Sequence, residues 1–128
     1  PAVIDEPVSN PTTDVIPYDE LAPPYVAVDE PATFMGGRED QFHKWVQDNV
    51  NYPQVALDNQ IEGRVIVEFC VGLGGNIRDI KILRSVDPSL DAEVIRVLKT
   101  SPSWSEPKMN GRVVKQRFTI PIVFQISK

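Results

Sequence analysis

The chain has 128 residues, of which 41% are hydrophobic, and this is enough to bury the core of one small domain. Its formal net charge of −5 is unevenly placed, because the first 37 residues hold seven acids, seven of the 12 prolines and no lysine or arginine. The remainder carries a net charge of +2. An acidic arm before a nearly neutral unit argues against a nucleic-acid-binding protein, since the phosphate backbone rewards a concentrated basic face.

Cysteine and membrane signals are sparse. Cys70 is the single cysteine, so the chain has no internal disulfide and no cysteine-based metal site. No apolar run approaches the roughly 20 residues that are needed to cross a bilayer. The chain starts at Pro1 without a methionine or a signal sequence. We therefore expect an excised fragment whose anchoring segment lies upstream.

Residues 1–31 are predicted to be a Pro-rich acidic linker before a folded domain at residues 32–128. Each proline fixes φ and pushes the preceding residue into extended geometry, which predicts a stiff, solvated spacer. Val26-Ala27-Val28 is an apolar patch that could dock on the domain as a strand. Phe34-Met35 is the first apolar pair of the domain, and Gly36-Gly37 is predicted to be a flexible turn.

Helical periodicity begins at Arg38 and predicts a helix that ends before Pro53, because the residue before a proline avoids the helical region. Pro53 can open a short second helix that extends to Asn59. A third helix follows Asp87-Pro88, an N-cap followed by a proline at the first helical position. Its apolar stripe is expected to face a sheet and consists of Leu90, Val94, Val97 and Leu98.

Three segments alternate between apolar and polar residues and are predicted strands. The first two, Arg64–Val71 and Ile77–Ser85, flank the glycine-rich turn Gly72–Asn76 and should form a hairpin. The third is Arg112–Ile126. It contains Pro121, which cannot donate to a ladder, so this strand is predicted to lie at an edge of the sheet.

These elements predict a two-layer α+β fold with the element order ααββαβ. The last strand pairs beside the first, so the three-stranded sheet is antiparallel with the order 2-1-3. The helices cover one face, and Trp104 in the loop before the last strand is expected to fill the edge of the core. The outer rim of the last strand stays unpaired, which is an aggregation hazard unless a partner uses it.

Catalytic chemistry has little support in the sequence. A cysteine hydrolase built on Cys70 and His43 is one alternative, but a passive mid-strand thiol and a partly exposed helix histidine are the simpler interpretation. No ligand spacing predicts a metal site. The Gly72–Gly75 segment joins two strands rather than a strand and a helix, unlike a phosphate-binding loop. We therefore expect no enzymatic activity, metal or cofactor.

The C-terminal end is basic. After Glu106 there are no acids, and Lys108, Arg112, Lys115, Arg117 and Lys128 give a charge of +5. Such residues can guard an edge strand against aggregation. A basic edge can equally receive an extended, acid-bearing peptide as an added strand. Both interpretations stay open on the residues alone.

Several motifs then follow one another along the chain: Tyr52-Pro53 with Ala56, Ile61–Val65, the glycine-rich hairpin, Ser85–Glu93, Pro102-x-Trp104 and Thr119–Phe124. Together they resemble the TonB C-terminal domain family, in a branch with a Gly-Gly-led N-terminal helix, over residues 26–128. The enterobacterial pattern Gln-Pro-x-Tyr-Pro is only partly present, because the chain keeps Tyr52-Pro53 alone.

The resemblance implies an energy transducer of Gram-negative bacteria that is anchored in the inner membrane and crosses the periplasm with a Pro-rich spacer. Its last strand would pair with the TonB box of outer-membrane transporters, for example in iron-siderophore uptake. Proton-motive force, delivered through the ExbB–ExbD complex, would pull on that pairing. The expected partner-binding residues are Val113, Val114, Lys115, Gln116, Arg117, Phe118, Thr119, Ile120, Ile122, Val123, Tyr52 and Pro53.

Within that set, Lys115 and Arg117 are expected to favour acidic residues of the partner, and Arg117→Pro is expected to abolish binding. Two alternatives keep the domain and change its role. Similar C-terminal domains occur on membrane-bound sensor peptidases, where they would be recognition modules without transport. The unpaired rim could also pair with that of a second copy to form a homodimer.

Overall fold

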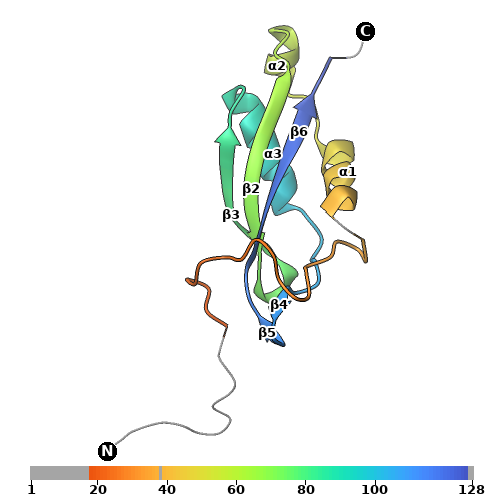
Figure 1. The fold of residues 1–128 in the computed structure, drawn as a ribbon. Helices are drawn as coiled ribbons and strands as arrows, with labels where there is room; N and C mark the ends of the chain where they lie inside the picture. The colour runs from red at the N-terminus through yellow and green to blue at the C-terminus, as the bar shows by residue number, and fades with distance from the viewer. Residues whose placement is uncertain (1–17, 38, 127–128) are drawn as a thin grey trace, which may run out of the picture.

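The computed structural model describes residues 18–37 and 39–126 and has a two-layer α+β fold (Figure 1). Its helices are α1 (Glu39–Asn49), α2 (Gln54–Asp58) and α3 (Pro88–Lys99). The main sheet consists of β2 (Gly63–Val71), β3 (Ile77–Arg84) and β6 (Gln116–Phe124). Its order is β3-β2-β6 with both pairs antiparallel, which confirms the predicted topology and the edge position of the last strand.

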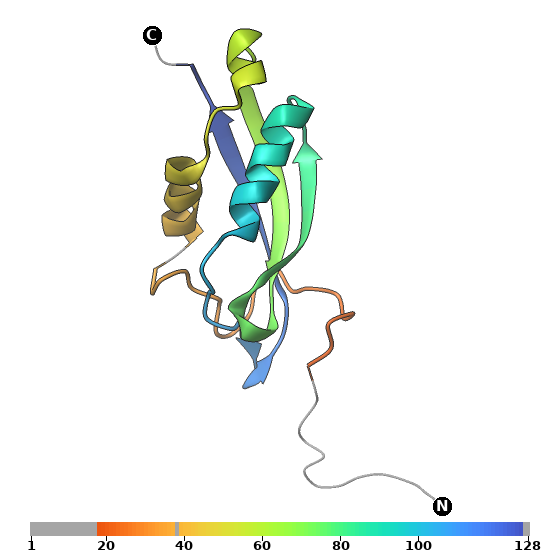
Figure 2. The ribbon, with the colours of Figure 1, turned by 180° about the vertical axis from the view of Figure 1, so that it is seen from behind.

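One face of this sheet forms the core. Figure 2 shows α3 lying across that face, with α1 beside it. The alternation of β2 places Val65, Val67 and Phe69 in the core, and all three are fully buried. The predicted stripe of α3 packs against them and is buried as expected: Leu90, Val94, Val97 and Leu98.

The helix boundaries follow the predicted signals. Asp87 caps α3 by accepting a hydrogen bond from the Ser89 N–H at 3.0 Å, and Pro88 occupies the first turn. The short second helix is present, but Pro53 is its N-cap rather than its first residue, and α2 ends at Asp58, one residue before the predicted Asn59. Arg38, where helical periodicity begins, lies outside the described residues, as do Lys128 and the first 17 residues of the predicted linker.

Trp104 fills the edge of the core, as predicted, and is only 4% exposed. Its ring contacts four phenylalanine rings, with centroid distances of 4.8 Å to Phe42 and 5.0 Å to Phe118. The main-chain N–H of Trp104 donates to the Gly75 carbonyl at 2.7 Å. Gly75 has a φ of +72°, and a Cβ there would lie 1.7 Å from the Trp104 oxygen, so only glycine fits this close approach.

The prediction of one strand from Arg112 to Ile126 is wrong at its start. The first part is β5 (Arg112–Val113), which forms a separate hairpin with β4 (Lys108–Met109). The turn between them is Asn110-Gly111, with φ of +54° and +79°, the pattern of a type I′ turn. Because β2 ends opposite Gln116, the main ladder offers no partner to the residues before β6.

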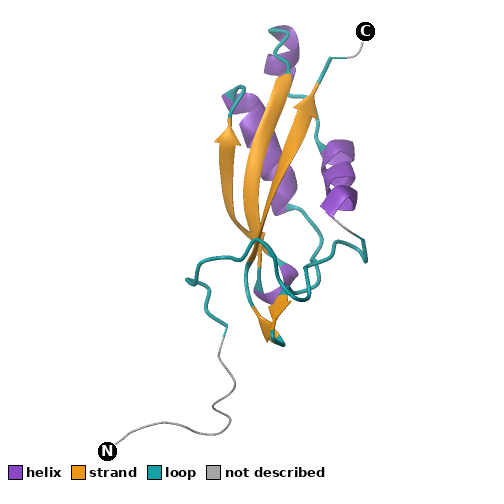
Figure 3. Cartoon of the chain, in the orientation of Figure 1, coloured by secondary structure: helices purple, strands orange, loops and turns teal. Residues whose placement is uncertain are grey.

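The leader, residues 18–37, lies against the domain from Tyr18 onward, although the sequence predicted a solvated spacer up to residue 31. Figure 3 shows it as a loop that crosses the lower end of the sheet before it reaches α1. The main chains of Glu30 and Lys108 form two hydrogen bonds: the Glu30 N–H donates to the Lys108 carbonyl at 3.0 Å, and the Lys108 N–H donates to the Glu30 carbonyl at 2.9 Å. Phe34 is buried in the core. Phe34 and Gly37 close a tight turn through two hydrogen bonds.

Candidate functional site

The outer edge of β6 is the feature that the sequence singled out. Main-chain groups of a strand point alternately to its two sides, and Arg117 and Val123 direct theirs away from β2. Thr119 and Pro121 share this parity. We call the outward main-chain groups of these four residues the β6 edge. The missing N–H of Pro121 therefore faces away from the sheet and removes no bond to β2.

Both ends of the β6 edge are occupied by other parts of the chain. At the start, the Tyr25 N–H donates to the Lys115 carbonyl at 2.9 Å and the Arg117 N–H donates to the Tyr25 carbonyl at 2.8 Å. This short pairing is parallel. At the far end, the side-chain amide of Gln47 on α1 bonds both main-chain groups of Val123, at 2.6 and 3.1 Å. A carboxamide thus takes the place of a neighbouring peptide group.

Between these two occupied ends the edge is open. Within residues 18–37 and 39–126, four main-chain groups of this edge have no hydrogen-bond partner: the Arg117 carbonyl, the Thr119 N–H and carbonyl, and the Pro121 carbonyl. We call these four groups the central window. They comprise three acceptors and one donor, so an extended peptide alongside them can form up to four main-chain hydrogen bonds.

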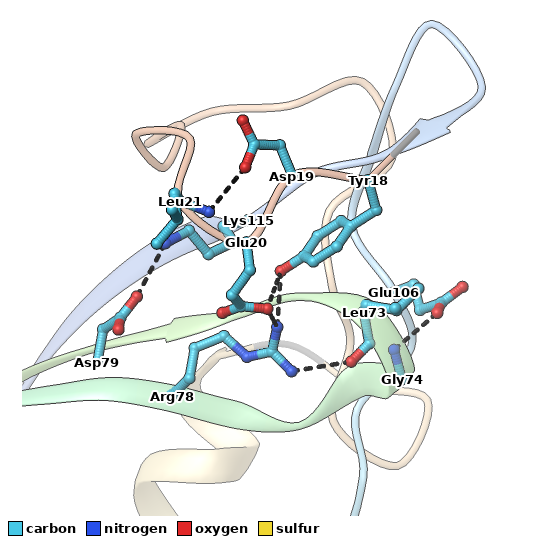
Figure 4. A network of polar contacts seen from close by, with 10 residues as sticks. All are labelled: Tyr18, Asp19, Glu20, Leu21, Leu73, Gly74, Arg78, Asp79, Glu106 and Lys115. Carbon is cyan, nitrogen blue, oxygen red and sulfur yellow. Dashed lines mark hydrogen bonds and ion pairs between the residues drawn. The ribbon is translucent and has the colours of Figure 1, made fainter. Parts of the chain in front are cut away.

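Two basic side chains accompany the edge on the open face of the sheet, and they differ in availability. Lys115 is 8% exposed and pairs with Asp79 at 3.0 Å (Figure 4). Its burial opposes the charge, but the hydrogen bond and the charge of Asp79 raise the pKa of Lys115. Lys115 is thus already paired within the chain, and its contact with acidic residues of a partner stays a prediction. Arg117 is 42% exposed and lies 3.7 Å from Glu68, a loose contact.

The leader is held on the open face by a second polar cluster (Figure 4). Arg78 of β3 donates to the Tyr18 hydroxyl at 2.6 Å and to the Leu73 carbonyl at 2.9 Å, and it forms an ion pair with Glu20. The Gly74 N–H donates to Glu106 at 2.7 Å beside this cluster. Neither the leader contacts nor the Gln47 contact has a periodic signal in the sequence, and both were missed.

The other predicted partner-binding residues fall into three places. Val113 lies in β5 and Val114 follows it, outside the main ladder. The even-numbered residues of β6 bond to β2, and their side chains are buried: Gln116, Phe118, Ile120 and Ile122. Tyr52 and Pro53 lie beyond the far end of the edge, where Tyr52 donates to the Ile61 carbonyl and contacts Phe124. Their side chains are not part of the central window.

The structure does not join His43 and Cys70. Cys70 is buried on the face of the sheet opposite to the core, whereas α1 packs into the core through Phe42 and Val46. Burial raises the pKa of the Cys70 thiol, which lowers its thiolate fraction. In the described part of the chain, no three His, Cys, Asp or Glu side chains gather as metal ligands do.

The helices of the described residues give no candidate for a membrane span, since none combines sufficient length with sufficient apolar character. This finding concerns only residues 18–37 and 39–126.

Comparison with known proteins identifies the family of the chain. The family described as Gram-negative bacterial TonB protein C-terminal matches residues 48–126. The curated Protein TonB of Pseudomonas aeruginosa is 36% identical over 80 residues, which cover 60% of this chain and 22% of that protein. The chain thus spans less than a quarter of this relative's length.

Solved structures give the same result. The solution NMR structure of the Pseudomonas aeruginosa TonB CTD matches with a TM-score of 0.52 and 34% identity, over 64% of this chain and 83% of that one. The NMR structure of the Helicobacter pylori TonB-CTD (residues 194–285) has a TM-score of 0.51 at 21% identity, over 70% and 94% of the two chains, and it supports the fold alone.

Proposed function

Because the chain belongs to the Gram-negative bacterial TonB protein C-terminal family, we propose that its β6 edge binds the TonB box of outer-membrane transporters as an added strand. The family consists of transport proteins that are not enzymes, and its C-terminal domain is periplasmic. In the proposed role, the domain transmits energy derived from the proton-motive force to nutrient transporters. Its inner-membrane anchor and its contact with ExbB–ExbD would belong to an upstream part of the protein.

The observation that carries this proposal is the central window. It offers unpaired main-chain groups on β6, which is one of the two edge strands of the sheet, while β2 in the middle is paired on both sides. A partner strand supplies N–H groups to the carbonyls of Arg117, Thr119 and Pro121 and a carbonyl to the Thr119 N–H. Side chains of the buried β6 residues hold this row of groups in place from the core.

Such a row suits a load-bearing but reversible contact. A strand pulled along its own axis loads several hydrogen bonds together, and each is worth about 1 kcal/mol net. A few such bonds resist a brief pull and still release the partner afterwards. The contact needs no chemical step, in agreement with a family of transport proteins.

The test uses Thr119→Pro, because the Thr119 N–H is the one donor of the central window and points away from β2. We expect the variant to fold, since Pro121 already occupies an equivalent outward position, and to lose about tenfold or more in affinity for a TonB-box peptide. Isothermal titration calorimetry with a panel of such peptides measures this. Thr119→Ala, which keeps the N–H, is the matched control.

Equal affinity of a folded Thr119→Pro variant and the wild type would refute docking at this edge. The variant Arg117→Pro, suggested by the sequence, is less suitable because the Arg117 N–H donates to Tyr25 rather than to the central window. Sedimentation at high concentration is run in parallel, since a second copy could occupy the same edge.

A further inference from the structure

The start of the β6 edge is covered by the chain's own leader. Residues 24–26, which we call the strap, run parallel to β6 and contact it through both main-chain groups of Tyr25. The Arg117 N–H and the Lys115 carbonyl, which a longer partner peptide would use, are thereby taken. The strap thus forms the kind of strand addition that the edge offers to a partner.

The strap is held weakly compared with the leader on either side of it. Tyr25 is 45% exposed and Val26 is 63% exposed, so little apolar surface is buried. Upstream, Tyr18 and Glu20 are held by Arg78. Downstream, Glu30 pairs twice with Lys108 and Phe34 is in the core. Lifting the strap therefore breaks two hydrogen bonds and leaves both attachments of the leader in place.

We propose that the strap is a built-in competitor, which covers the first positions of the docking edge and is displaced when a partner strand extends beyond the central window toward Lys115. This inference rests on the proposed function and adds its regulation. The main chain of Tyr25 competes with the main chain of the partner, because each can form hydrogen bonds with the Arg117 N–H and the Lys115 carbonyl. The strap precedes residue 48, where the family match begins, so it lies outside the part of the chain that the family model matches.

Competition has a quantitative consequence. A long peptide binds only molecules whose strap is lifted, so its apparent affinity is lowered in proportion to the fraction of such molecules. Weakening the strap raises that fraction and therefore raises the affinity. Tyr25→Pro removes the N–H that donates to Lys115, one of the two bonds of the strap. Tyr25→Ala keeps both main-chain groups and is the matched control.

The first measurement needs no ligand. Amide hydrogen exchange of the full 128-residue chain, followed by NMR, should show protection of the Arg117 amide and little protection of the Thr119 amide. Tyr25→Pro should lower the Arg117 protection about fivefold, the equivalent of one hydrogen bond, and Tyr25→Ala should change it less. An unprotected Arg117 amide in the wild type, or equal protection in wild type and Tyr25→Pro, would overturn the strap.

The second measurement adds a TonB-box peptide to the same proteins in a calorimeter. Tyr25→Pro should bind a peptide long enough to reach past the central window about fivefold more tightly than the wild type, and a peptide confined to the window equally well. Equal affinity for the long peptide overturns the competition, while the Thr119→Pro result still decides the docking edge. If no peptide binds any variant, the proposed function and the competition fall together, and Arg117 protection alone identifies the strap as the occupant of the edge.

Discussion

The two long sides of β6 differ sharply although they belong to one strand. The side toward β2 is paired along the whole strand, from Gln116 opposite Val71 to Phe124 opposite Gly63. Among residues 18–37 and 39–126, the outward side is paired only at its ends, by Tyr25 and by the Gln47 side chain. The same nine residues therefore support the fold on one side and leave a docking surface on the other.

This division follows residue parity. Even-numbered residues of β6 bond to β2 and bury their side chains, whereas Arg117, Thr119 and Val123 are exposed and bond outward or not at all. Pro121 shares the outward parity, so the proline that would break a central strand is tolerated. Substitutions at adjacent positions should consequently separate stability from binding.

The largest expected effect tests the inner side. Ile120→Ala removes a side chain that is 2% exposed in the core and should lower the free energy of unfolding by about 3 kcal/mol. Thr119→Ala, one residue away and exposed, should change it by less than about 0.5 kcal/mol. Urea unfolding followed by tryptophan fluorescence measures both. Similar losses of unfolding free energy at the two positions would mean that even- and odd-numbered residues of β6 do not differ in their contribution to the fold.

Much of this division could be predicted from the sequence. The alternation through Val65, Val67 and Phe69 identifies the core face, since a strand has a period of two. Pro121 predicts the edge because a central strand needs every ladder donor. The break before β6 also had a signal, the Asn110-Gly111 pair, which is typical of a two-residue hairpin turn.

The occupied ends of the edge could not be predicted. Tyr25 acts through its main chain, which every residue has, and Gln47 lies on a helix surface where a polar residue is ordinary. The alternation places Lys115 on the open face but does not show that its side chain is buried there and paired with Asp79. Such contacts join segments far apart in the sequence and leave no local pattern.

The next prediction concerns the far end of the outward side. Gln47→Ala removes both hydrogen bonds to Val123, and we expect a loss of about 1–2 kcal/mol in stability together with faster exchange of the Val123 amide. Lys44→Ala, at an exposed position of the same helix, is the control and should cost less than about 0.5 kcal/mol. Unchanged exchange at Val123 would show that Gln47 does not close the edge in solution.

A pH titration separates the body of the domain from the edge. Glu93 on α3 accepts hydrogen bonds from Arg96 and from the Asn51 N–H, and the bond from Arg96 holds the pKa of Glu93 below its ordinary value. Because the pKa of Glu93 is lower in the folded state, its ionised form stabilises the fold. This contribution to the free energy of unfolding is complete above the unfolded pKa of about 4.3, and it disappears as the pH falls through the folded pKa.

Wild type should therefore be more stable to unfolding than Glu93→Gln by about 1 kcal/mol at pH 7, and this difference should shrink as the pH falls below the unfolded pKa of about 4.3. Urea unfolding at several pH values measures this. The contacts of the β6 edge join main chain to main chain or to a neutral amide, so the protection factors of Arg117 and Val123 should stay constant over the range in which the protein is folded. If the difference in unfolding free energy between wild type and Glu93→Gln grew on acidification, the lowered pKa of Glu93 would be contradicted.

The smallest effect is expected from charge at the edge. Arg117 lies 3.7 Å from Glu68 in a loose, partly exposed contact, so Arg117→Gln should change the free energy of unfolding by less than about 0.5 kcal/mol. At low salt, this variant should bind an acid-bearing TonB-box peptide about twofold more weakly than wild type. At high salt, the two proteins should bind the peptide equally well. Arg64→Gln, on the same open face but opposite Val123, is the matched control. A tenfold loss that persisted at high salt would show that the guanidinium, rather than the main chain of the central window, carries docking.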